Sequence, residues 1–75
     1  MRYFFDLTGE DPDDTGAELP GIAEVQPAAV RALLEAAIER PARLSTHPLH
    51  LKVRDPSGRT VLTASLNIAL DFQDR

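Results

Sequence analysis

The sequence predicts one small α/β domain of the α+β type, a two-layer β-α-β-β sandwich in which one helix packs on a mostly antiparallel three-stranded sheet. Residues 2–7, 49–54 and 60–72 alternate apolar and polar side chains with a period of two, as half-buried strands do. Residues 27–40 instead carry apolar side chains at helical spacing. A chain of 75 residues suffices for one domain, so we treat residues 1–75 as a single unit.

The first strand is expected over residues 2–7, where Tyr3, Phe5 and Leu7 share one face. Thr8 and Gly9 end it. Residues 10–18, called the acidic loop here, hold five of the twelve acidic residues together with a proline and a glycine. Such a composition predicts a solvated loop that orders itself weakly. Residues 17–19 add a short extended piece before Pro20.

The helix is expected to begin at Pro27, because proline is tolerated at the first helical position. Pro41 predicts its end near Arg40. The apolar stripe expected to cover the sheet consists of Val30, Leu33, Leu34, Ala37 and Ile38. A linker over residues 42–48 then leads to the second strand.

The last two strands form a hairpin, because residues 55–58 read Asp-Pro-Ser-Gly, a tight-turn sequence. The last strand, expected over residues 60–72, is the longest and most regular, and we place it in the middle of the sheet. The face of the sheet away from the helix is then open to water or to a partner.

Composition excludes several classes of function. The chain has no cysteine, which rules out disulfides and thiolate metal sites and suits a reducing, cytoplasmic location. Asp6 interrupts the first apolar run, so no signal peptide is expected, and no run approaches the ~20 apolar residues of a membrane span. The net charge of −4 disfavours nucleic acid as a partner, since phosphate contacts need lysine and arginine.

Three segments together resemble a family of very short bacterial proteins that is catalogued only as a domain of unknown function. They are Arg-Tyr-Phe-Phe-Asp at residues 2–6, Asp-Asp-Thr-Gly-Ala-Glu-Leu-Pro at 13–20, and the hairpin sequence at 53–59. Members open with an Arg-Tyr-Phe-Phe strand and continue with an Asp-x-x-Gly-x-Glu-Leu box, an alanine-rich helix and a final hairpin. The resemblance implies this order of elements over nearly the whole chain, and it brings no activity, ligand or catalytic residue.

The open face of the expected sheet is the first candidate for a partner site. Alternation places there Arg2, Phe4, His50, Lys52 and Arg54. An aromatic side chain among cations can stack on single-stranded bases, but one aromatic on an acidic protein argues against that use. A second copy or another protein is the preferred partner, bound around Phe4, with Val61 and Ala69 also facing outward, or at a sheet edge.

The acidic loop is the alternative candidate, as a cation site. Its possible ligands are Asp11, Asp13, Asp14 and Glu18, which offer the carboxylate oxygens that hard cations prefer. The spacing of Asp11, Asp13 and Thr15 before Gly16 resembles the first half of a calcium loop. The match then fails, because Ile22 stands where that loop needs a bidentate acid.

The function expected from the sequence is therefore a non-enzymatic interaction module without a cofactor, acting as a homodimer or docking on another protein. A ligand- or cation-binding protein is the alternative. A small enzyme is the least favoured reading, because no serine stands in a nucleophile-elbow context and paired carboxylates occur only in the acidic loop. The sequence identifies no small-molecule ligand.

Overall fold

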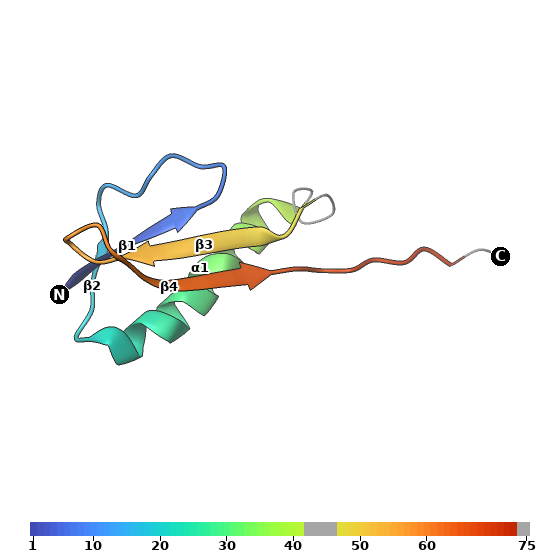
Figure 1. Ribbon diagram of the computed structural model, residues 1–75. Helices are drawn as coiled ribbons and strands as arrows, with labels where there is room; N and C mark the ends of the chain where they lie inside the picture. Colours follow the sequence, from blue (N-terminus) through green and yellow to red (C-terminus); the bar gives the residue numbers. More distant parts are fainter. Residues whose placement is uncertain (42–46, 74–75) are drawn as a thin grey trace.

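The computed structural model describes residues 1–41 and 47–73, and in these ranges one α-helix lies across one face of a four-stranded sheet (Figure 1). The elements are β1 (Arg2–Leu7), β2 (Ala17–Glu18), the short 3-10 helix η1 (Ile22–Glu24), α1 (Val25–Glu39), β3 (Leu49–Arg54) and β4 (Thr60–Leu66). The expected two-layer α+β fold is confirmed. The fourth strand is the short piece at residues 17–18, which pairs with β1. Of the linker expected over 42–48, residues 42–46 lie outside the described residues.

The strand order is β2-β1-β3-β4 with antiparallel neighbours, so the expectation that the last strand lies in the middle is wrong. The acidic loop is the reason. It carries the chain back along β1, so that Leu19 donates a backbone hydrogen bond to Met1 at the start of that strand (3.0 Å). The helix therefore starts beside the beginning of β1 and ends beside its far end, where Arg40 forms an ion pair with Glu10. The next strand then enters directly beside β1 and antiparallel to it.

The last strand is also shorter than expected. Leu66 pairs with Leu49, the first residue of β3, and within residues 1–41 and 47–73 no strand lies beyond that pair. Residues 67–73, called the extended segment here, continue the line of β4 away from the body of the domain (Figure 1). This projection accounts for the elongated dimensions of 54 × 24 × 18 Å.

The core lies between α1 and the inner face of the sheet. Its buried residues are Tyr3, Val25, Ala29, Leu33, Leu49, Leu51 and Val53. The expected helix stripe is only partly correct, since Leu33 is buried whereas Leu34 and Ile38 are 49% and 80% exposed. The helix instead presents its smaller residues to the sheet, such as Ala29, because small side chains let helix and sheet approach closely. The larger apolar side chains of Val30, Leu34 and Ile38 are left about half exposed or more.

Two local departures from expectation have simple causes. The α-helix begins at Val25, two residues before Pro27, which occupies its third position. The first four N–H groups of a helix have no partner within the helix, so proline there loses no hydrogen bond. In β4 the register shifts beside Arg54, which pairs with Thr60, whereas Val53 pairs with Leu62. Val61 is therefore a bulge residue, packs against the core, and does not join the outward-facing group.

Candidate functional site

The sheet face away from α1, called the open face, carries the five side chains expected there. The register sets Phe4 beside Arg54 and Asp6 beside Lys52 on neighbouring strands. His50 pairs with Ser65 on the far side of β3. The alternation expected from the sequence is thus confirmed for these strands, and Asp6 joins the group in their midst.

Arg54 organises one end of the open face. Its Nε donates to Asp6 Oδ2 (2.5 Å), and its Nη2 donates to Asp6 Oδ1 (3.2 Å) and to the carbonyl of Asp13 (2.9 Å). Its guanidinium carbon lies 5.0 Å from the centre of the Phe4 ring. The planar fork suits this paired recognition of a carboxylate. The hydrogen bond from Arg54 lowers the pKa of Asp6, despite partial burial.

The Asp13 carboxylate fixes the path of the acidic loop. Oδ2 accepts the backbone N–H of Phe5 (3.0 Å), and Oδ1 accepts those of Thr15 and Gly16 (both 3.1 Å). Burial raises the pKa of Asp13, but these three N–H donors outweigh it and hold the pKa below its usual value. The loop is therefore ordered against β1, contrary to the expectation from its composition.

Gly16 allows the loop to approach β1 closely. Its φ is +73°, and a Cβ there would lie 2.9 Å from the backbone oxygen of Tyr3 and 3.0 Å from Phe4 Cε1. Arg2 reaches over the same turn and donates to the carbonyl of Thr15 (2.7 Å). Two of the five expected partner-binding residues, Arg2 and Arg54, thus hold the acidic loop in place, and Phe4 lies under Arg54 beside Gly16. His50 and Lys52 are exposed.

The four acidic residues proposed as cation ligands do not converge. Asp13 uses both oxygens on backbone N–H groups, and Glu18 pairs with the Met1 ammonium (2.7 Å), which lowers its pKa. Asp11 and Asp14 are exposed. Among the described residues there is no group of three or more histidine, cysteine, aspartate or glutamate side chains that could hold a metal ion.

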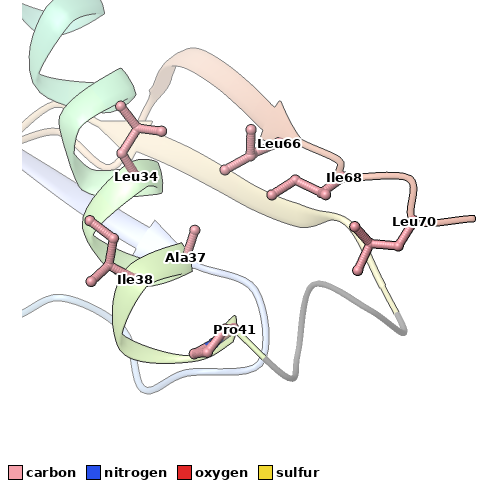
Figure 2. A pocket seen from close by; sticks show the side chains of 7 residues that line it. All are labelled: Leu34, Ala37, Ile38, Pro41, Leu66, Ile68 and Leu70. Atoms are coloured by element: carbon pink, nitrogen blue, oxygen red, sulfur yellow. The ribbon is translucent and has the colours of Figure 1, made fainter. Parts of the chain in front are cut away.

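A larger concavity than any at the open face lies between the C-terminal half of α1 and β4 with the extended segment. Figure 2 shows its side chains converging from these two sides. This apolar groove has a volume of about 540 Å³ and is lined by Leu34, Ala37, Ile38, Pro41, Leu66, Ile68 and Leu70. None of these side chains can donate or accept a hydrogen bond, so the groove suits an apolar occupant.

The outer edge of β4 borders this groove and presents free backbone groups. Thr8 on the β1 side donates to the carbonyl of His50 (2.9 Å), so His50 directs its backbone groups to β1. In an antiparallel sheet successive residues point to opposite sides. Leu51 therefore points to β4, where it pairs with Ala64. Ser65, the next residue of β4, directs its N–H and C=O outward, where the described chain places no strand.

Sequence reasoning missed the groove, although two signals for it were present. The helix carries apolar side chains over an arc wider than one sheet face needs, since Val30, Leu34 and Ile38 lie beside the Ala29–Leu33 stripe. The alternation of the last strand also runs to Phe72, beyond the reach of the six-residue β3. Both patterns indicate apolar surface in excess of what one copy covers.

Comparison with known proteins gives one match. A family model described as "Domain of unknown function (DUF6894)" matches residues 2–67. No curated protein and no solved structure matches the chain. Of the helices in residues 1–41 and 47–73, none has the length and apolar content needed to cross a membrane.

Proposed function

The chain belongs to the family described as Domain of unknown function (DUF6894), a membership that brings no activity with it, and we propose that it is a non-enzymatic protein-interaction module. Its binding surface is the apolar groove together with the outer edge of β4. An extended apolar segment of a protein partner pairs with the edge and places alternate side chains in the groove. This is strand addition, in which backbone hydrogen bonds supply affinity and side-chain pockets supply specificity.

The observation that carries the proposal is the amount of uncovered apolar side chain near the outer edge of β4, where the described residues place no strand. On the helix, Val30, Leu34 and Ile38 are 50%, 49% and 80% exposed. On the extended segment, Ile68 and Leu70 are 45% and 66% exposed. A contiguous patch of this kind on a small domain is typical of a protein-binding surface.

The lining of the groove supports a binding role over a catalytic one. Catalytic pockets bring a few polar or titratable groups together around the reacting atoms. The apolar groove offers none. The carboxylates of Asp6 and Asp13 are engaged by Arg54 and by backbone N–H groups. A cytoplasmic location is part of the proposal, because a chain without cysteine suits a reducing compartment.

The test is peptide binding observed by NMR on the isotope-labelled chain at low micromolar concentration. The probes are short peptides that alternate valine with threonine, compared with an amphipathic leucine-rich helical peptide. We expect the extended peptides to shift the amide signals of Thr63 and Ser65 and the methyl signals of Leu34 and Ile38. Ile38→Asn should weaken binding at least ~10-fold, because it removes apolar surface from the groove.

Arg31→Asn is the matched control, since it makes the same exposed-to-asparagine change on the charged face of α1. It should leave binding unchanged. Shifts confined to His50 and Lys52 would instead assign the open face as the binding surface. Absence of any shift with all extended peptides would refute strand addition.

A further inference from the structure

We propose that the occupant of this surface is a second copy of the chain, an inference that rests on the proposed function and names its partner. Two β4 strands pair antiparallel about a two-fold axis perpendicular to the sheet. Each extended segment then runs along the outer edge of the other copy's β4. The result is one continuous sheet with both helices on the same face.

Within the described residues, one edge of the sheet is covered and the other is not, and this difference favours pairing through β4. The β1 edge is covered, because β2 pairs with its first residues and the Asp13 carboxylate accepts the N–H of Phe5. In the part of the chain that the structure describes, no segment pairs with the β4 edge, and residues 62–70 contain neither a charged residue nor a proline. Monomeric proteins blunt exposed edges with such residues. An unprotected apolar edge is expected of a strand that is paired in the functional state.

The extended segment supplies side chains that lack cover in one copy. Leu66 lies on the helix side of the sheet, and Ile68, Leu70 and Phe72 follow it at every second position, so they share that side. Phe72 is 94% exposed. Because β3 begins at Leu49, opposite Leu66, no strand of the described residues lies beside this segment. A second copy brings its own β4 to that position.

The helices complete the match. Val30 and Leu34 line a smaller concavity with Ala64 and Leu66, so the exposed side of α1 borders β4. A two-fold axis perpendicular to the sheet turns the same side of the second α1 toward the first across the paired strands. The uncovered helix stripes and the side chains of both extended segments then share one apolar layer. Each copy offers both the groove and the segment that fills it, as a two-fold interface requires.

The test is the molar mass of the 75-residue chain by light scattering, from about 1 µM to about 1 mM, with three variants of the extended segment. We expect the mass to rise toward twice 8.2 kDa. Leu70→Asn should weaken dimerisation at least ~100-fold, because the dimer loses two buried leucines. Ala69→Asn introduces the same side chain on the other side of the segment and should alter the dissociation constant less than about threefold.

Ala69→Pro tests the strand pairing itself. By parity with Ser65, Ala69 directs its N–H outward to the partner, so proline removes a hydrogen-bond donor and should weaken dimerisation at least ~10-fold. These positions are exposed and outside every helix and strand, and circular dichroism checks that the fold is intact.

The outcomes separate this inference from the proposed function. A monomer at about 1 mM would overturn the inference and leave the peptide test as the measure of strand addition. A dimer that Ile38→Asn weakens but Leu70→Asn and Ala69→Pro do not would overturn the exchange of segments while retaining the groove. A dimer whose dissociation constant none of the three variants changes would overturn both the exchange of segments and the use of the groove in dimerisation.

Discussion

Asp13 and Gly16 decide how the chain returns from β1 to the start of the helix. The Asp13 carboxylate takes three backbone N–H groups that the loop and β1 leave unpaired. Gly16 supplies a backbone conformation and a closeness to Tyr3 that a side chain would prevent. Both belong to the Asp-x-x-Gly-x-Glu-Leu box noted in the sequence. In this chain that box fixes the path of the acidic loop against β1.

Replacement of Gly16 by alanine should be much more damaging than the same change at Gly58. Both glycines have positive φ, +73° and +88°, so both variants incur backbone strain of about 1 kcal/mol. Only at Gly16 does the new Cβ meet a backbone oxygen, at 2.9 Å, and this clash should raise the loss to about 2–4 kcal/mol.

Urea unfolding followed by circular dichroism measures both losses, with Gly58→Ala as the matched control, since nothing lies within 4 Å of its added Cβ. Equal destabilisation of the two variants would show that the contact with β1 is not what requires glycine at position 16.

At the scale of elements, local patterns predicted each strand and the helix but not how they meet. The alternation in residues 2–7 and 49–54 is local and was read correctly. Strand order depends on the return path of the acidic loop, which Asp13 and Arg54 fix through contacts between segments about 40 residues apart in sequence. Composition alone indicates a solvated loop there. If that loop did not carry the chain back along β1, β3 would run parallel to β1, and the last strand could lie between them as expected.

The candidate site was predictable only in part for a similar reason. The open-face residues follow from period two, and the structure places them where expected. The groove depends on which arc of α1 faces the sheet. Ala29 and Leu33 occupy that arc, and the larger Leu34 and Ile38 fall outside it. Helical spacing identifies a broad apolar surface, whereas the choice of the buried part rests on packing distance between helix and sheet.

The acidic loop, as an element held by ionised carboxylates, should detach in acid. The native pKa values of Asp6 and Asp13 lie below those of the unfolded chain, about 3.9, so the unfolded state binds more protons in this range. The stability they confer is present above about pH 4 and is lost as the pH falls through their native pKa values.

The free energy of unfolding in urea should therefore be nearly constant from about pH 7 to about pH 5 and should decline below about pH 4. Asp13→Asn should lower stability at neutral pH and make the acid decline shallower. In that variant Asp55 still contributes to the pH dependence of stability, because the hydrogen bond from the Ser57 hydroxyl lowers its pKa. An unchanged decline in Asp13→Asn would show that the loop carboxylate is not the group that titrates.

At the scale of the whole molecule, charge and apolar surface are segregated. The acidic loop, Arg2, Arg54 and Lys52 gather around the open face and the β1 edge. Among the described residues, no charged side chain lines the apolar groove on the helix side of the sheet, and β4 at the opposite edge carries none. Each copy has a net charge of −4, so two copies that meet at the groove repel one another weakly while burying neutral surface.

The response of self-association to salt therefore distinguishes the two faces. Screening shortens the range of the repulsion between like-charged copies from about 14 Å at 50 mM salt to about 4 Å at 500 mM, and it leaves apolar burial intact. Dimerisation through the β4 edge should thus strengthen by about two- to fivefold over this range, as sedimentation velocity can measure. An interface that joined the cations of the open face to the acidic loop of a second copy would instead weaken with salt. A loss of tenfold or more in affinity would move the interface to the open face, where the cations Lys52 and Arg54 lie beside the Asp6 carboxylate.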